Sequence, residues 1–359
     1  MKKFRVGILG ATGMVGQRFM SLLENHPWFS VGVLAASSRS RGKKYRDATR
    51  GRWLLSTPIP QSMEGIIVDS VEEDFKKIIS KVDVVFCALD AQKSTIQAIE
   101  NRYAASGIPV ISNNSAHRWT DDVPMIMPEI NPHHLKLIAI QRKKRGWGKG
   151  FIVVKPNCSL QSYVPVIWAL KAFGPINVSV TTLQAISGAG KTFATWPEMV
   201  DNCIPFISGE EEKTEQEPLK ILGTVVGSRI EIAAKPVISA TCIRVACSDG
   251  HMASVAVKFE RKPSLTEILR AIRTYENPLA NLNLPSAPRE FIRVFSHDDR
   301  PQTNIDRNYE HAMGITCGRF REDTYFDWKF IALSHNTIRG AAGGAVLTAE
   351  LLVKKGYIQ

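Results

Sequence analysis

The 359-residue sequence predicts an α/β protein in which a doubly wound parallel sheet is followed by an α+β domain with a mixed, largely antiparallel sheet. Two observations predict this fold class. Over the first half, short apolar runs alternate with helical patterns, as they do where parallel strands are buried on both faces. In the second half, longer segments alternate polar and apolar residues, as antiparallel strands with one covered face do.

The first half contains the segments expected to build the parallel sheet. Strands are expected at residues 4–9, 31–36, 66–68, 82–88 and 109–112, with a further apolar segment at 151–154. Helices are expected at 14–25, 72–80, 93–106 and 132–145. Residues 82–88 read Val-Asp-Val-Val-Phe-Cys-Ala, a run typical of a strand that is buried on both faces. This alternation predicts a Rossmann-like domain.

The second half contains the segments expected to build the second sheet. Strands are expected at 178–186, 237–246, 254–260, 291–295, 314–320 and 326–333. A helical apolar pattern begins at Leu160, and further helices are expected at 210–225, 265–275 and 337–355. The predicted division is therefore a first domain at 1–155, completed by the C-terminal helix 337–359, and a second domain at 156–336.

Glycines interrupt the last expected helix. Gly340, Gly343 and Gly344 each cost about 1 kcal/mol relative to alanine in a helix interior. Their presence predicts close packing of this helix against another backbone or a cofactor.

The charge balance is basic, with 46 Lys+Arg against 34 Asp+Glu. The segments Arg39–Arg52 and Arg142–Lys149 carry much of the excess, and they suit a phosphorylated substrate or cofactor. For Arg142–Lys149 a solvated loop is the simpler interpretation. No aromatic residues are interleaved with the basic ones and no helix-turn-helix pattern is present, so we expect no nucleic-acid partner.

The apolar runs and the cysteines restrict location. No run approaches the ~18 apolar residues of a membrane span, and the N-terminus leads directly into a strand instead of a signal peptide. The six cysteines are widely spaced without a C-x-x-C pair, so no zinc site is expected. Reduced thiols in a cytoplasmic protein are the simplest account.

A glycine turn follows the first expected strand and opens the first helix. The spacing Gly10-x-x-Gly13-x-x-Gly16 lets a pyrophosphate approach the backbone at the helix N-terminus. The cofactor-binding residues expected here are Gly10, Thr12, Gly13, Met14 and Val15. The alternative is a tight turn that binds no ligand.

The end of the second expected strand indicates which dinucleotide binds. An NAD site usually has an acidic residue there for the ribose 2′-hydroxyl, but residues 26–44 contain none. Ser37, Ser38 and Arg39 stand there instead and suit a 2′-phosphate, so NADP is the expected cofactor. The alternative is a solvated basic loop.

Cys158 stands in Pro156-Asn157-Cys158-Ser159, between an apolar strand-like segment and a helix. The first-turn N–H groups and the positive end of a helix dipole favour thiolate over thiol. We therefore expect Cys158 to be reactive. The alternative is a buried structural cysteine.

Three further motifs follow. Gln184 ends an expected strand before the glycine-rich turn that contains Ser187 and Gly188. Arg244 precedes His251 by seven residues, and Asn336-Thr337 opens the last helix.

Together with the glycine turn and the cysteine motif, these residues resemble the aspartate-semialdehyde dehydrogenase family, most closely its archaeal/fungal branch, to which Ile207–Lys213 also conforms. The resemblance extends along the whole chain. It implies a homodimer or homotetramer and a reversible, NADPH-dependent conversion of L-4-aspartyl phosphate to L-aspartate 4-semialdehyde and phosphate. That step feeds lysine, threonine, methionine and isoleucine synthesis.

The resemblance also implies residue roles. Cys158 is the expected nucleophile, His251 the acid/base and Gln184 the residue that orients the intermediate. Arg244 is expected to bind the substrate carboxylate. The remaining expected substrate contacts are Arg118 and Asn157 for the phosphate, and Glu210 and Lys213 for the substrate amino group and phosphate. Ser187, Gly188, Asn336 and Thr337 are expected near the cofactor. A helix-surface ion pair is the alternative for Glu210 and Lys213.

Other functions fit these residues less well. A malonyl-CoA reductase of the same family would use the same thioester and hydride steps, but the intact Pro156-Asn157-Cys158-Ser159 disfavours it. N-acetyl-glutamyl-phosphate reductase and glyceraldehyde-3-phosphate dehydrogenase differ around the cysteine. A non-catalytic nucleotide-binding sensor would have no need of Cys158 or His251.

Overall fold

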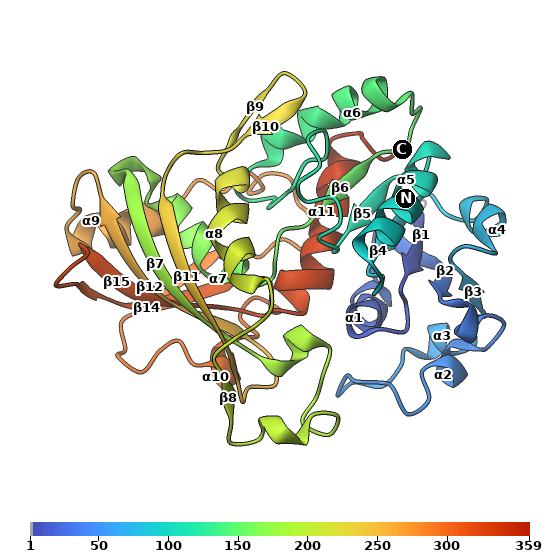
Figure 1. The fold of residues 1–359 in the computed structure, drawn as a ribbon, viewed down its shortest axis with the longest axis horizontal. Helices are drawn as coiled ribbons and strands as arrows, with labels where there is room; N and C mark the ends of the chain where they lie inside the picture. Colours follow the sequence, from blue (N-terminus) through green and yellow to red (C-terminus); the bar gives the residue numbers. More distant parts are fainter. Residues whose placement is uncertain (1–2) are drawn as a thin grey trace.

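The computed structural model describes residues 3–359 and contains two sheets that lie side by side (Figure 1). The first is parallel and has six strands in the order β3-β2-β1-β4-β5-β6. Its strands are β1 (Phe4–Leu9), β2 (Phe29–Ala36), β3 (Val68–Ser70), β4 (Val84–Cys87), β5 (Val110–Ser112) and β6 (Ile152–Val154). This order reverses direction beside β1, so a crevice opens at the carboxyl ends of the strands there.

Helices cover both faces of the first sheet. They are α1 (Met14–Leu23), α2 (Tyr45–Ala48), α3 (Gln61–Glu64), α4 (Phe75–Ile79), α5 (Lys93–Ala105) and α6 (Leu137–Arg145). On one face Ile8 and Phe86 pack in a core cluster with Phe19 of α1, and on the other Val85 packs with Tyr103 of α5. The predicted burial of the strands on both faces is confirmed.

The second sheet is mixed, as predicted. Its seven strands run in the order β13-β14-β15-β12-β7-β11-β8. They are β7 (Pro175–Gln184), β8 (Cys203–Ile204), β11 (Val237–Val245), β12 (His251–Phe259), β13 (Ile292–Phe295), β14 (Ile315–Glu322) and β15 (Trp328–Ser334). The pairs β7–β11 and β13–β14 are parallel, and the other pairs are antiparallel.

One face of this sheet is covered by helices and the other is not. The helices α7 (Leu160–Ala169), α8 (Glu210–Ile221) and α9 (Leu265–Arg273) pack against the strands, and a short α10 (Thr303–Asp306) lies beyond them (Figure 1). Along β12, Ala253, Val255 and Val257 are buried, whereas Ser254 and Lys258 are exposed. This alternation leaves an outer face that no part of residues 3–359 covers.

Besides shifted boundaries and the short elements α2, α3, β8 and α10, which were not predicted, the structure differs from the prediction in two longer segments. The expected helix 210–225 ends at Ile221, and a hairpin of β9 (Thr224–Val226) and β10 (Arg229–Glu231) follows. Gly223 causes this change, because a Cβ there would lie 2.3 Å from the Glu231 carbonyl oxygen. The last helix begins as a π-helix, Ile338–Ala342, and continues as α11 (Gly343–Lys354).

The glycines at this junction pack closely against other groups, as predicted. A Cβ at Gly340 would lie 2.8 Å from the Cys158 Cβ, and one at Gly344 would lie 2.4 Å from the Lys155 Cε. From Gly343 to Leu352, α11 is buried on all sides and packs in the core cluster that contains β1. The end of the chain therefore returns to the first sheet.

Candidate active site

Cys158 lies between β6 and α7, where the two sheets meet, and its side chain is partly exposed. The sequence Pro156-Asn157 turns the chain sharply after β6. Asn157 Oδ1 then accepts hydrogen bonds from the Ser159 backbone N–H at 2.8 Å and from Ser159 Oγ at 2.7 Å. These bonds fix the loop that presents the sulfur.

Glu210 joins several of the predicted residues. Its carboxylate accepts hydrogen bonds from Asn157 Nδ2 at 3.0 Å, from Gln184 Nε2 at 3.2 Å and from Lys213 Nζ at 2.7 Å. Burial raises the pKa of Glu210, but Lys213 and the hydrogen bonds outweigh it and lower the pKa overall. The ion pair with Lys213 does form, yet Glu210 is buried and faces the cysteine loop, so it is more than a surface pair.

Arg118 is brought to the same loop but is held by protein groups. Its Nη1 donates to Glu217 Oε1 at 2.8 Å, its Nε to the Lys155 carbonyl at 3.0 Å and its Nη2 to the Asn113 carbonyl at 3.2 Å. The other oxygen of Glu217 accepts from the Asn157 backbone N–H at 2.7 Å. A contact between Arg118 and phosphate remains a prediction that depends on its other N–H hydrogens.

His251 and Arg244 both bind the backbone of Ala185. The Ala185 N–H donates to His251 Nδ1 at 3.1 Å, and Arg244 Nη1 donates to the Ala185 carbonyl at 2.7 Å. Gly188 lies directly against both side chains, since a Cβ there would lie 2.8 Å from Arg244 Nη1 and 3.0 Å from His251 Nε2. Because Nδ1 accepts, the neutral imidazole carries its hydrogen on Nε2.

Burial determines the ionisation of both reactive side chains. It lowers the pKa of His251 to about 3, with Arg244 adding to the effect. Burial, followed by the Glu210 charge, raises the pKa of Cys158 to about 11, against the opposing charges of Lys155, Arg118 and Arg244. The expectation that the helix N-terminus makes Cys158 a ready thiolate is therefore wrong in direction. One reason is that the Ser159 N–H is already bonded to Asn157.

The glycine turn at the end of β1 has the expected form. Gly10 has φ +90°, and a Cβ there would lie 2.3 Å from the Ala88 carbonyl oxygen. Gly13 caps α1 and is exposed, Thr12 and Val15 are partly exposed, and Met14 is buried. The backbone at the N-terminus of α1 is therefore open to a phosphate group.

The predicted 2′-phosphate residues lie at the carboxyl end of β2. Ser37, Ser38 and Arg39 are all exposed there. Arg41, two residues on, is engaged by Glu73 and Asp74, each at 2.7 Å. Arg39 forms no ion pair with any residue between 3 and 359, so its guanidinium remains available for an anion.

The segment after β15 links the two sheets. Asn336 Nδ2 donates to Ser187 Oγ at 2.8 Å, and Asn336 Oδ1 accepts from the Gly250 N–H at 2.8 Å. Thr337 Oγ1 accepts from Arg18 Nε of α1 at 2.9 Å. Asn336, Thr337 and Ser187 thus lie together between the nucleotide turn and His251.

Two residues of this site were not predicted from the sequence, namely Glu217 and Lys155. Glu217 follows Glu210 by seven residues, two helical turns, so its place on the same face of α8 was visible in the spacing. Lys155 is a lysine directly after an apolar strand, which was a weaker signal.

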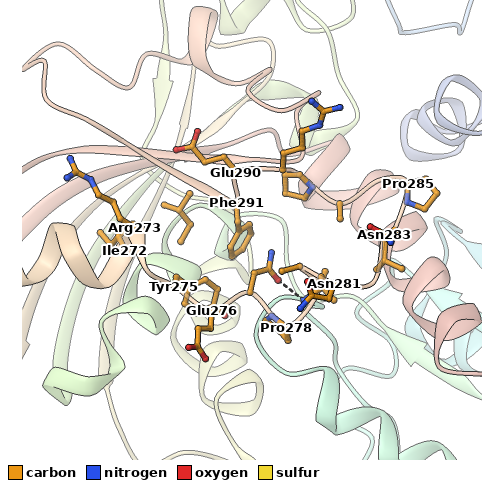
Figure 2. Close-up of a pocket in the computed structure, with 18 of the residues that line it drawn as sticks. Ile272, Arg273, Tyr275, Glu276, Pro278, Asn281, Asn283, Pro285, Glu290 and Phe291 are labelled. Carbon is orange, nitrogen blue, oxygen red and sulfur yellow. Dashed lines mark hydrogen bonds between the residues drawn. The ribbon is translucent and has the colours of Figure 1, made fainter.

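A separate open hollow of about 1190 Å³ lies beside α9 and β13 (Figure 2). Phe291 stands in the middle of its lining, near Tyr275 and Ile272. None of the predicted site residues lines it. Among residues 3–359 no cluster of three His, Cys, Asp or Glu is placed to hold a metal ion, and no helix is long and apolar enough to cross a membrane.

A parallel nucleotide-binding sheet beside a cysteine and a buried histidine defines a nucleotide-dependent dehydrogenase. Residues 5–138 match the family described as "Semialdehyde dehydrogenase, NAD binding domain", and residues 169–339 match "Semialdehyde dehydrogenase, dimerisation domain". The chain belongs to the aspartate-semialdehyde dehydrogenase family.

Individual relatives support this assignment over the whole length. The aspartate-semialdehyde dehydrogenase of Archaeoglobus fulgidus is 44% identical, with 99% of this chain and 100% of that protein aligned. That of Aspergillus fumigatus is 42% identical, with 99% of each covered. A crystal structure of the Candida albicans enzyme with NADP superposes with a TM-score of 0.87 and 37% identity, covering 99% of this chain and 100% of that one.

Proposed function

We propose that this protein catalyses the reversible, NADPH-dependent reductive dephosphorylation of L-4-aspartyl phosphate to L-aspartate 4-semialdehyde. The observation that carries the proposal is the network in which Asn157, beside Cys158, shares the Glu210 carboxylate with Gln184 and Lys213. The similarity to archaeal and fungal members of the family along the whole chain supports it. The malonyl-CoA reductase and sensor alternatives have no such support.

Cys158 forms the covalent intermediate. Its thiolate attacks the acyl carbon, the C–S bond forms, and the C–O bond to phosphate breaks to leave a thioester. When bound, NADPH would supply the hydride that reduces the thioester carbon. The C–S bond then breaks, which releases the aldehyde and returns the thiolate of Cys158. Gly340 lies so close to the Cβ and backbone of Cys158 that a larger residue there would displace the nucleophile.

His251 acts on the oxygen of the reacting carbon. Its Nε2 has no hydrogen-bond partner among residues 3–359, and with Nδ1 occupied by Ala185 it presents an N–H. This group donates to the developing oxyanion, which is the acid half of the predicted acid/base role.

The charged residues fit a small anionic amino acid. Arg244 keeps N–H groups beyond the one bound to Ala185, and we assign them to the substrate carboxylate. Glu210 is assigned to the substrate amino group and Lys213 to the phosphate, with Arg118 and Asn157 in support. Gln184 holds the intermediate from the end of β7.

NADP is the proposed cofactor. The open turn at Gly10, Thr12, Gly13, Met14 and Val15 suits the pyrophosphate, and unpaired Arg39 with Ser37 and Ser38 suits the 2′-phosphate. Ser187, Gly188, Asn336 and Thr337 line the path from there to His251. The solved Candida albicans relative was crystallised with NADP, which agrees with this choice.

We also propose that the chain forms a homo-oligomer through the outer face of the seven-stranded sheet. This face is uncovered within the described chain, and the match at residues 169–339 is to a dimerisation domain. The domain division at 155/156, with 337–359 completing the first domain, belongs to the same proposal.

The deciding experiment is phosphate-dependent reduction of NADP by aspartate semialdehyde, followed at the NADPH absorbance. Turnover that requires phosphate is expected, with NAD much weaker than NADP. The Cys158→Ala variant should lose turnover while retaining NADPH binding. NADPH oxidation with malonyl-CoA, and none of these results with aspartate semialdehyde, would contradict the proposal.

A further inference from the structure

Lys155 is a buried lysine whose ammonium makes fewer hydrogen bonds than it can donate. It follows β6, is 3% exposed, and donates a 2.7 Å hydrogen bond from Nζ to the Gly340 carbonyl oxygen. An ammonium has three donors, and this is the one bond that Nζ makes within residues 3–359. It also forms no ion pair with a carboxylate there, although a buried cation normally has one.

Lys220 provides a comparison. It is 4% exposed, and its Nζ donates to three carbonyl oxygens, those of Arg118, Thr120 and Val123. Such a lysine is fully explained as a structural anchor. Lys155 is equally buried and has a single acceptor, so a structural role accounts for only part of its position.

Among the charged groups around Lys155, Cys158 has the largest effect on it. Both touch Gly340, Lys155 through the carbonyl oxygen and Cys158 through the Cβ contact described above. The other charges around Cys158 are Glu210 of α8, Arg118 of the loop after β5 and Arg244 of β11. Those around Lys155, besides Cys158, are Arg118, Arg339 and Glu129.

Two cations near Cys158, Lys155 and Arg244, form no ion pair with a carboxylate among residues 3–359, and Arg244 donates to the Ala185 carbonyl and is assigned to the substrate. Arg118 is paired with Glu217, and Arg339 is paired through both Nη atoms with Glu129. Among the cations that favour the Cys158 thiolate, Lys155 has the largest effect, ahead of Arg118 and Arg244. In return the thiolate raises the pKa of Lys155, which burial lowers to about 7.

We propose that Lys155 is a positioning residue whose ammonium charge compensates the Cys158 thiolate before it attacks the substrate. The inference rests on the proposed function, in which Cys158 is the nucleophile. When the thiol ionises, the S–H bond breaks and the sulfur keeps the electron pair. The proton is taken up by Lys155 where its amine is neutral, and by solvent where the ammonium is already charged, so the thiolate forms beside a cation in either case. The anionic substrate then meets a pair with no net charge instead of an isolated anion.

The test measures the thiolate directly. Cys158 is alkylated with iodoacetamide across a pH series, and the labelled peptide is quantified by mass spectrometry. The exposed Cys203 serves as an internal reference in every sample. Two variants are compared with the unmodified chain. Lys155→Met removes charge and hydrogen bond, whereas Lys155→Gln removes the charge but keeps an amide donor for the Gly340 carbonyl.

In both variants the pH midpoint of Cys158 alkylation should rise by at least one unit, which slows labelling at pH 7 by about tenfold or more. The Cys203 profile should stay where it is. Glu210→Gln should move the Cys158 midpoint downward, because it removes the anion that disfavours the thiolate.

An unchanged midpoint in Lys155→Gln overturns the inference, even if Lys155→Met fails to fold. In that case Lys155 only anchors Gly340. The readout is independent of turnover, so the inference can fail while Cys158→Ala still abolishes activity, and the two proposals are judged separately.

Discussion

The Ala185 backbone N–H donates a hydrogen bond to His251 Nδ1 at 3.1 Å. This contact decides which nitrogen of the ring faces the crevice with a hydrogen. A histidine that binds through Nδ1 as an acceptor keeps its Nε2 hydrogen while it is neutral. Burial and the nearby Arg244 keep it neutral, since they lower its pKa to about 3. His251 is thus prepared to donate a hydrogen bond at once and is a poor base at rest.

Replacing His251 with Phe should lower kcat by about 10²- to 10⁴-fold, the usual contribution of a positioned proton donor. The variant keeps a ring of similar shape but has no N–H. Cofactor affinity, measured by NADPH fluorescence, should change little. Because the folded pKa is about 3, the wild-type rate should show no inflection from His251 between pH 5 and 9. An inflection near pH 6.5 that disappears in the variant would contradict the assignment.

Replacing Arg39 with Ala should weaken NADPH binding by about 10- to 100-fold, the worth of a hydrogen bond to a charged group. NADH affinity should stay within about twofold, because NADH has no 2′-phosphate. Arg41→Ala is the matched control, since its guanidinium is already paired with Glu73 and Asp74. Equal losses for both dinucleotides, measured by titration calorimetry, would remove Arg39 from the phosphate site.

Adding a methyl group at Gly340 should damage the site. The new Cβ would lie 2.8 Å from the Cys158 Cβ, and overpacking of this kind costs about 1–3 kcal/mol. We expect Gly340→Ala to displace Cys158. The value of kcat should therefore fall strongly, whereas the thermal midpoint of unfolding should fall only slightly. Gly148→Ala is the control, because nothing lies within 4 Å of a Cβ there. If Gly340→Ala kept the wild-type kcat, the close contact between residue 340 and Cys158 would be shown not to matter for catalysis.

Stability should fall as the pH falls below about 6.5. Burial lowers the pKa of His134 to about 4, so between that value and its unfolded pKa of ~6.5 the unfolded chain binds more protons. The native state is therefore favoured above pH 6.5 and loses about 2 kcal/mol from this residue by pH 5.

A substitution tests this origin of the acid sensitivity. His134→Gln keeps a donor for the Gly223 carbonyl, which His134 Nε2 contacts at 2.9 Å, but has no proton to gain. Its midpoint in thermal unfolding should change less between pH 8 and pH 5 than that of the unmodified chain. His297→Gln, at an exposed position, should leave the pH dependence intact. An identical slope in all three would contradict the account.

Patterns local in sequence predicted much of the fold. The alternation of short apolar strands with helices is a local property, and β1 and α5 begin where they were expected. The hairpin of β9 and β10 was missed because the predicted helix continued through Gly223, which the structure places against the Glu231 carbonyl at the end of the hairpin.

The sequence predicted which residues form the site, but not how burial and charge change their pKa values. Motifs such as Pro156-Asn157-Cys158 identify residues that act together. The structure brings Asn157, Gln184 and Lys213 to the carboxylate of Glu210. The direction of the Cys158 pKa was wrong, because burial depends on α8 and the last helix, which lie far away in the sequence.

The return of α11 to the first sheet has a consequence for how the chain is made. Residues 343–352 complete the core around β1, and Gly340 lies against Cys158. When the first half of the protein has left the ribosome, the residues that complete its core have therefore not yet been synthesised. The first sheet therefore cannot bury this part of its core during synthesis until residues 343–352 have left the ribosome.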